Sequence, residues 1–273
     1  MTYRGLLVIS AMLAIMGMGC GDDDGGTTPP TPTPDAVVMM DAAAGDADPA
    51  DAMAPANASV RAFHLSPGTP NVDIFVNGGE TAAVTDLAFG ASTDYLEVPA
   101  GTYTFDVAVT GMTVADSALN IPGLELAAGA SYTAVAHGAL DNTEKPLTGL
   151  ALADDQTAPM DGNIRVRIVH AAVAANQVDI WNVTDAAAPS AILEDVDYGV
   201  ASDFLELPAQ AYVVGIDTDN DGTPELTFNI PALDAGTIAT VFAVSDADGT
   251  VSLQAQLGGS TVVAIAANPA DAT

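Results

Sequence analysis

The stretch ASTDYLEVPAGTY (residues 91–103) decides the fold, because the chain repeats it further on as ASDFLELPAQAY (201–212). Aromatic, acidic and proline residues keep their order in the two versions. A long segment that returns once, rather than every roughly 20–50 residues, indicates a duplicated domain and not a solenoid. The sequence therefore predicts two related domains in tandem.

Other segments match in the same order before and after this stretch. The matching pairs are VRAFH (60–64) with VRIVH (166–170), NVDIF (71–75) with QVDIW (177–181), and LNIPG (119–123) with FNIPA (228–232). We expect the first domain over residues 59–155 and the second over residues 163–267.

Each domain shows the alternation of β-strands. In IRVRIVH (164–170), isoleucine and valine alternate with arginine. A period of two places the apolar residues on one face of a strand. Turn residues such as Asn77-Gly78-Gly79 separate the runs. Many short strands in each domain predict an all-β chain with two tandem immunoglobulin-like β-sandwich domains.

The repeated residues resemble the bacterial family DUF4397, a domain of unknown function found in secreted and surface proteins. The first domain carries the pattern in Arg61, His64, Ser66, Pro67, Val72, Asp73, Tyr95, Pro99, Gly101 and Tyr103. The second carries it in Arg167, His170, Val178, Asp179, Phe204, Pro208 and Tyr212, but has Ala171-Ala172 and Gln210 in place of Ser66-Pro67 and Gly101. The resemblance implies an immunoglobulin-like sandwich and no known activity.

Six of these repeated positions are polar residues with a choice of roles: Arg61, His64 and Asp73, with Arg167, His170 and Asp179 as their counterparts. Strand alternation places both histidines at the edge of a core, where either aspartate would accept a hydrogen bond from histidine or arginine. We expect structural hydrogen bonds here, and a share in a ligand site is the alternative.

The N-terminus has the features of an export signal. Arg4 precedes the apolar segment 5–16, which is too short to span a membrane. MGMGC (16–20) resembles a bacterial lipoprotein box, which implies lipidation of Cys20 after removal of a signal peptide at residues 1–19. Acyl chains on Cys20 would anchor the protein to a membrane. The alternative is an ordinary secretory signal with an incidental cysteine.

Residues 20–58 are rich in proline, aspartate and alanine and predict a disordered tether. Gly21 follows the cysteine where aspartate would mark inner-membrane retention. We therefore expect a lipid-anchored protein of the cell envelope, at the outer membrane, facing the periplasm or the cell surface. Since Cys20 is the single cysteine, the chain forms no internal disulfide.

The net charge of −31, from 36 acidic and 5 basic residues, excludes nucleic acid as an expected partner. Phosphate neutralisation requires lysine and arginine, and an acidic surface repels polyanions. An acidic shell also keeps an exported protein soluble.

The segment DTDNDGTPE (217–225) contains the spacing D-x-D-x-D-G of the first half of a calcium loop. It makes Asp217, Asp219, Asp221 and Glu225 candidate ligands. Position twelve is Phe228 instead of the bidentate glutamate, and the flanking residues have the pattern of strands. A β-hairpin turn rich in aspartate and glycine is the alternative. Weakly bound calcium is the one cofactor that the sequence suggests.

No catalytic constellation is evident, since no G-x-S-x-G surrounds a serine and the third histidine, His137, has no partner in sequence. The sequence predicts a non-catalytic envelope protein that presents two modules for structural or adhesive contact with an envelope protein or polysaccharide. The alternative is a module that binds calcium or a small ligand. A short polar linker (152–163) predicts relative motion of the two domains.

Overall fold

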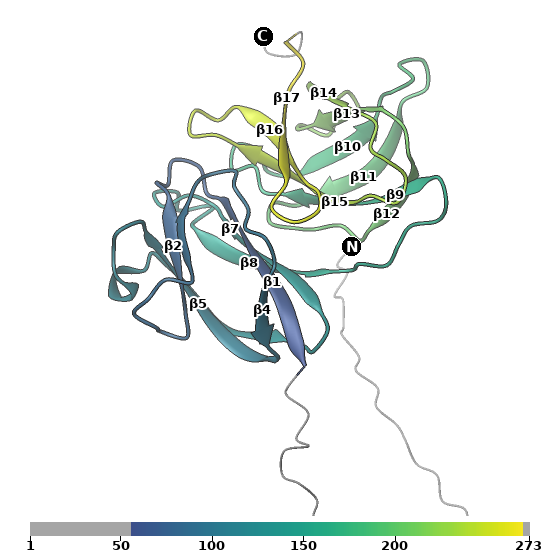
Figure 1. Ribbon diagram of the computed structural model, residues 1–273. Coiled ribbons are helices and arrows are strands. Elements are labelled where there is room, and N and C mark those ends of the chain that lie inside the picture. Colours follow the sequence, from purple (N-terminus) through teal and green to yellow (C-terminus); the bar gives the residue numbers. More distant parts are fainter. Residues whose placement is uncertain (1–55, 270–273) are drawn as a thin grey trace, which may run out of the picture. The chain divides into compact units, whose positions relative to one another are not determined.

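The computed structural model describes residues 56–269. They form strands and short 3-10 turns such as η2 (Val114–Asp116), with no α-helix among the described residues (Figure 1). The all-β prediction is therefore confirmed. None of the described residues forms a helix long and apolar enough to cross a membrane. The expected signal peptide, Cys20 and the tether up to residue 55 lie outside the described residues.

The first β-sandwich consists of two four-stranded sheets, β4-β1-β7-β8 and β3-β2-β5-β6. The strands of the first sheet are β1 (Asn57–Leu65), β4 (Leu96–Pro99), β7 (Ser131–His137) and β8 (Thr148–Asp154). Those of the second are β2 (Val72–Val76), β3 (Val84–Leu87), β5 (Gly101–Val109) and β6 (Leu119–Leu126). Strand β1 pairs in parallel with β7, and its other neighbour β4 is antiparallel.

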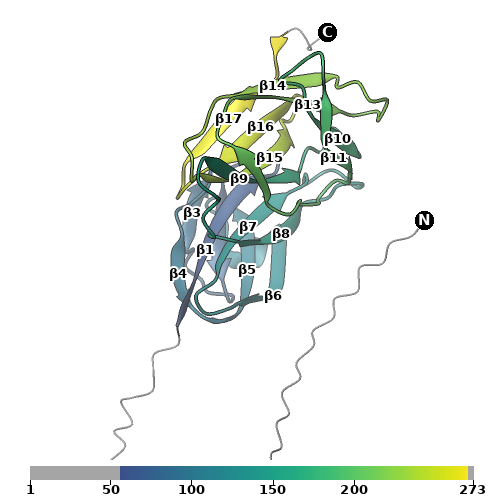
Figure 2. The ribbon, with the colours of Figure 1, turned by 90° about the vertical axis from the view of Figure 1, so that its right-hand side faces the viewer.

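The second sandwich has the same strand order with one strand added, in the sheets β12-β9-β15-β16-β17 and β11-β10-β13-β14. The first of these sheets contains β9 (Asn163–His170), β12 (Leu205–Pro208), β15 (Ile238–Ser245), β16 (Val251–Gln256) and β17 (Val262–Ala266). The other contains β10 (Val178–Asn182), β11 (Ser190–Val196), β13 (Tyr212–Asp217) and β14 (Leu226–Ile230). The added strand, β17, lies beside β16 at the sheet edge (Figure 2).

The repeated stretch forms the crossing between the two sheets of each sandwich. Its proline ends the edge strand, β4 or β12, and its tyrosine lies at the start of the next strand, β5 or β13, in the opposite sheet. The hydroxyl of Tyr103 donates to the carbonyl of Pro99 at 2.7 Å, and that of Tyr212 donates to the carbonyl of Pro208 at 2.8 Å. The same side chain therefore closes the same turn in both sandwiches.

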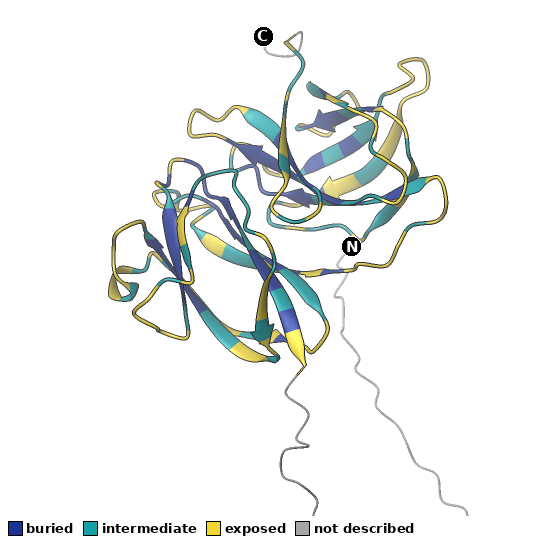
Figure 3. Cartoon of the chain, in the orientation of Figure 1, coloured by how far each residue is buried: buried dark blue, intermediate teal, exposed yellow. Residues whose placement is uncertain are grey.

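Buried residues form three apolar clusters, one inside each sandwich and one between them. The middle cluster joins Phe63, Leu65, Val135 and Leu152 of the first sandwich to Val169, Ala171, Phe242 and Val244 of the second. The rings of Phe63 and Phe242 meet edge to face, with centroids 5.0 Å apart. Strands β1 and β15 are accordingly buried over most of their length (Figure 3). The short linker predicts relative motion of the two domains. The shared core holds the two sandwiches together instead.

Candidate metal centre and the repeated polar residues

The candidate calcium loop is the hairpin between strands β13 and β14. Asp217, the last residue of β13, is fully buried. Its Oδ1 accepts hydrogen bonds from the backbone N–H of Asp219 (3.2 Å) and Asn220 (2.7 Å), and its Oδ2 accepts one from that of Gly222 (2.8 Å). Asn220 and Gly222 both have positive φ, which the turn requires. The buried carboxylate thus fixes the backbone around which the other acids are placed.

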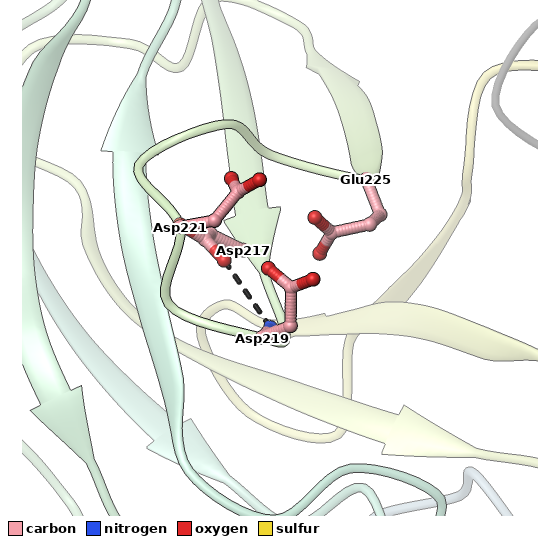
Figure 4. A group of neighbouring side chains, drawn as sticks. All are labelled: Asp217, Asp219, Asp221 and Glu225. Carbon is pink, nitrogen blue, oxygen red and sulfur yellow. Dashed lines mark hydrogen bonds between the residues drawn. The ribbon is translucent and has the colours of Figure 1, made fainter.

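The hairpin brings all four predicted ligands together (Figure 4). Asp217, Asp219, Asp221 and Glu225 each offer an oxygen, and these oxygens lie within 4.8 Å of one another. Calcium holds its ligand oxygens at about 2.3–2.6 Å, so two oxygens on one ion are at most about 5 Å apart. The spacing of the four carboxylates therefore fits a single calcium ion.

The electrostatics of the loop favour a cation. Desolvation, with the neighbouring charges of Asp221 and Glu225, raises the pKa of Asp219 above its ordinary value. The carboxylate of Glu225 accepts hydrogen bonds from the backbone N–H and hydroxyl of Thr218. No cationic side chain of the described residues pairs with the four acids, since the ion pairs among these residues involve only Asp154 and Asp155. A bound divalent ion would relieve this repulsion.

Two features separate this loop from a helix-flanked calcium loop. Strands β13 and β14 flank it, as their sequence pattern indicates. Phe228, at position twelve, is fully buried in the core of the second sandwich and cannot be a ligand.

The equivalent turn of the first sandwich, after β5, is fixed differently. There Asp73 of β2 accepts hydrogen bonds from the hydroxyl of Thr110 (3.1 Å) and the N–H of Gly111 (3.0 Å).

The repeated aspartates bind backbone instead of histidine or arginine, which corrects the expected pairing. Oδ1 of Asp73 accepts the N–H of Asp86 at 2.8 Å, and Oδ1 of Asp179 accepts that of Asp195 at 2.6 Å. Asp86 and Asp195 both have φ of 56°, in the left-handed region. Each repeated aspartate therefore holds an unusual backbone conformation in the neighbouring strand. These backbone donors lower the pKa of Asp73.

The repeated histidines, His64 and His170, are buried and hold the loop that follows their strand. Nδ1 of each accepts a backbone N–H two residues later at 3.4 Å. Nε2 of each lies near a carbonyl, that of Pro70 at 3.3 Å or of Asn176 at 2.7 Å. The proton therefore sits on Nε2 of a neutral ring. Burial lowers the pKa of both histidines.

The repeated arginines reach from one sandwich to the other. Arg61 donates from Nη1 to the carbonyls of Leu257 (3.3 Å) and Gly259 (3.1 Å). Arg167 donates to the carbonyl of Ala153 (2.7 Å) and to Oδ1 of Asp154 (2.6 Å). Asp154 is buried as well, and its Oδ2 lies 3.7 Å from Arg61. The carboxylate of Asp154 thus forms ion pairs with both buried guanidinium groups.

The remaining cations of the described residues join the same junction. Lys145 donates to the carbonyls of Val173 and Ala175, and Arg165 forms an ion pair with Asp155 of the linker at 2.6 Å. Sequence reasoning missed this role for Lys145 and for Asp154. The sequence signal for this junction lies in β1, on the face that points away from the core of the first sandwich. A solvent-exposed strand face carries polar residues, but this face carries Phe63 and Leu65.

Comparison with known proteins places a domain of unknown function, DUF4397, at residues 58–181, which span the first sandwich and strands β9 and β10. No curated protein matches the sequence. Two solved structures are similar at 12% identity, the Bacillus anthracis TIE protein and a structure described as "Alpha-glucan binding by a streptococcal virulence factor". Their TM-scores are 0.22 and 0.23 over 70% and 71% of this chain. The chain covers 34% of the former and 95% of the latter.

Proposed function

We propose that this chain is a non-catalytic lipoprotein of the bacterial cell envelope. Cys20 would carry the acyl anchor, and two tandem DUF4397-like sandwiches would present a contact surface to an envelope protein or polysaccharide. The position of the single cysteine shortly after the apolar segment 5–16 supports the anchor. The observation that supports a contact role is the apolar core shared by the two sandwiches.

A shared core matters for binding because it fixes the exposed surfaces of both sandwiches in one body. Two loosely tethered modules would lose orientational freedom on engaging one partner. A preorganised pair avoids that cost. Arg61 and Arg167 strengthen this arrangement, since each bonds to the sandwich opposite its own.

Accessibility on intact cells tests the location. A protease of broad specificity is added to the native host, and a C-terminal epitope tag is followed beside a Cys20→Ala control. Loss of the tag from whole cells, with the Cys20→Ala form released to the medium, is expected for an outward-facing lipoprotein. Protection until the outer membrane is opened would assign the periplasmic face. Membrane retention of the Cys20→Ala form would refute the lipid anchor.

We also propose that the β13–β14 hairpin binds calcium, on the strength of the four carboxylate oxygens that lie within 4.8 Å of one another. Three of these four residues are exposed, so an ion would reach them from solvent. We expect the dissociation constant of extracellular calcium modules, on the order of 10⁻⁴ to 10⁻³ M.

Thermal unfolding tests this second proposal. At tenfold excess over the dissociation constant, calcium should stabilise the fold by about 1.4 kcal/mol and raise Tm by about 3–5 °C. Asp219→Ala should abolish the rise, whereas the matched control Asp248→Ala, in another exposed turn, should keep it. Sodium chloride at equal ionic strength separates binding from screening of the acidic surface. An equal rise in sodium chloride would exclude a specific site.

A further inference from the structure

The second sandwich contains a cavity between its two sheets, with a volume of about 110 Å³. Residues of β9, β15, β16 and β17 line it on one side and residues of β10, β13 and β14 on the other. Several inward-facing aliphatic side chains remain half-exposed there, namely Ile168, Val214, Ile230, Val241 and Ile265. The core of this sandwich is therefore open to solvent along part of its length.

The walls of this cavity are apolar. No polar atom contributes to its accessible surface, and its two polar lining residues are Gln210 and Tyr212. The hydroxyl of Tyr212 is already bonded to the carbonyl of Pro208. A ligand with polar groups would lose its bonds to water without replacement, so sugars, nucleotides and amino acids are excluded as occupants.

A comparison of the two sandwiches explains why the cavity of the second is the larger. The repeat aligns Phe105 of β5 with Val214 of β13. Phe105 is buried in the first sandwich, where the corresponding cavity measures about 80 Å³. Val214 is half-exposed in the second. The smaller side chain leaves space that the aromatic ring fills in its counterpart.

We propose that this cavity binds the alkyl chain of an uncharged lipid. Aliphatic walls match a hydrocarbon chain, and apolar cavities of about 150 Å³ bind ligands as large as benzene, so four to six carbons fit roughly into this one. Charge decides against fatty acids, because no lysine or arginine lines the cavity and the chain carries a net charge of −31. Anionic head groups would be repelled at the opening. The proposal is independent of the anchor and of calcium.

Methyl NMR on the full chain carrying Cys20→Ala tests the proposal, because no acyl chain of the protein then competes. 1-Butanol, 1-pentanol and 1-hexanol are titrated in turn. We expect saturable shifts at methyl groups of Val241 and Ile265, with affinity rising about fourfold per methylene until the cavity is full. Hexanoate should bind several-fold more weakly than 1-hexanol. Absence of saturable shifts, or equal affinity for hexanoate, would overturn the proposal.

Two variants of neighbouring residues complete the test. Val214→Phe restores the residue of the first sandwich and should abolish alcohol binding. Val213→Phe makes the same change on the adjacent residue, which does not line the cavity, and should leave binding unchanged. Alcohol binding that survives Val214→Phe at wild-type affinity would contradict the assigned site. If Val214→Phe fails to fold, the position of the shifts in the Cys20→Ala chain decides.

Discussion

His137 shows how burial at the junction couples a single residue to pH. It ends strand β7 of the first sandwich, and its Nδ1 lies 3.0 Å from the hydroxyl of Tyr198 in the second. Burial, with a smaller contribution from His170, lowers the pKa of His137 to about 4. The same burial raises the pKa of Tyr198 to about 12. Both side chains are thus neutral over the whole physiological range.

This pKa predicts a loss of stability in mild acid. The unfolded chain takes up the proton near the ordinary value of 6.5, whereas the folded chain takes it up only near 4. The stability contributed by neutral His137 is therefore complete above pH 6.5 and is lost as pH falls toward 4, by at most about 3 kcal/mol. Denaturant unfolding of wild type and His137→Gln from pH 7 to pH 4 measures it. The two curves should converge in acid, and parallel curves would contradict the prediction.

At the scale of elements, the end of β7 depends on a glycine. Gly138 has φ of +83°, and a Cβ at this position would collide with the carbonyl oxygen of Pro146. Gly129 has φ of +74° with no atom close to its Cβ position. The two glycines therefore share a backbone conformation but differ in the space around them.

We expect Gly138→Ala to destabilise the fold by more than Gly129→Ala. The control carries only the cost of a left-handed alanine, about 1–2 kcal/mol. Gly138→Ala adds the collision, which forces the β7–β8 connection to move. Chemical denaturation of the two variants measures the difference in unfolding free energy. Equal decreases in unfolding free energy would show that the β7–β8 connection moves aside without an energetic penalty.

The strands could be predicted from the sequence, whereas the parts of the molecule that pack against them could not. A period of two in IRVRIVH identifies which residues share a face of β9. It says nothing about a partner on the other face, and there Arg167 and Val169 meet the first sandwich. The hairpin acids were found because D-x-D-x-D-G is a local pattern, while Asp154 bonds to Arg167 through tertiary contacts that no local spacing encodes.

At the scale of the molecule, the shared core predicts that both sandwiches unfold together. Phe63 lies in the first sandwich and packs on Phe242 of the second. Phe63→Ala should cost about 3–5 kcal/mol. Trp181, the single tryptophan, lies in the second sandwich and reports on it by fluorescence. In Phe63→Ala, the Tm reported by Trp181 fluorescence should fall by as much as the Tm reported by the circular dichroism of the whole chain. A Trp181 transition that stays in place would mean that the sandwiches unfold separately.

The placement of the cations has a consequence for digestion by trypsin, which cuts after lysine and arginine because an aspartate lies in its specificity pocket. Among the described residues these are Arg61, Lys145, Arg165 and Arg167, and every one is bonded at the junction or its linker. An otherwise acidic exterior offers the enzyme no target. Trypsin should therefore leave the folded body intact and cut only while the two sandwiches are separated. The digestion rate then measures how often the sandwiches separate.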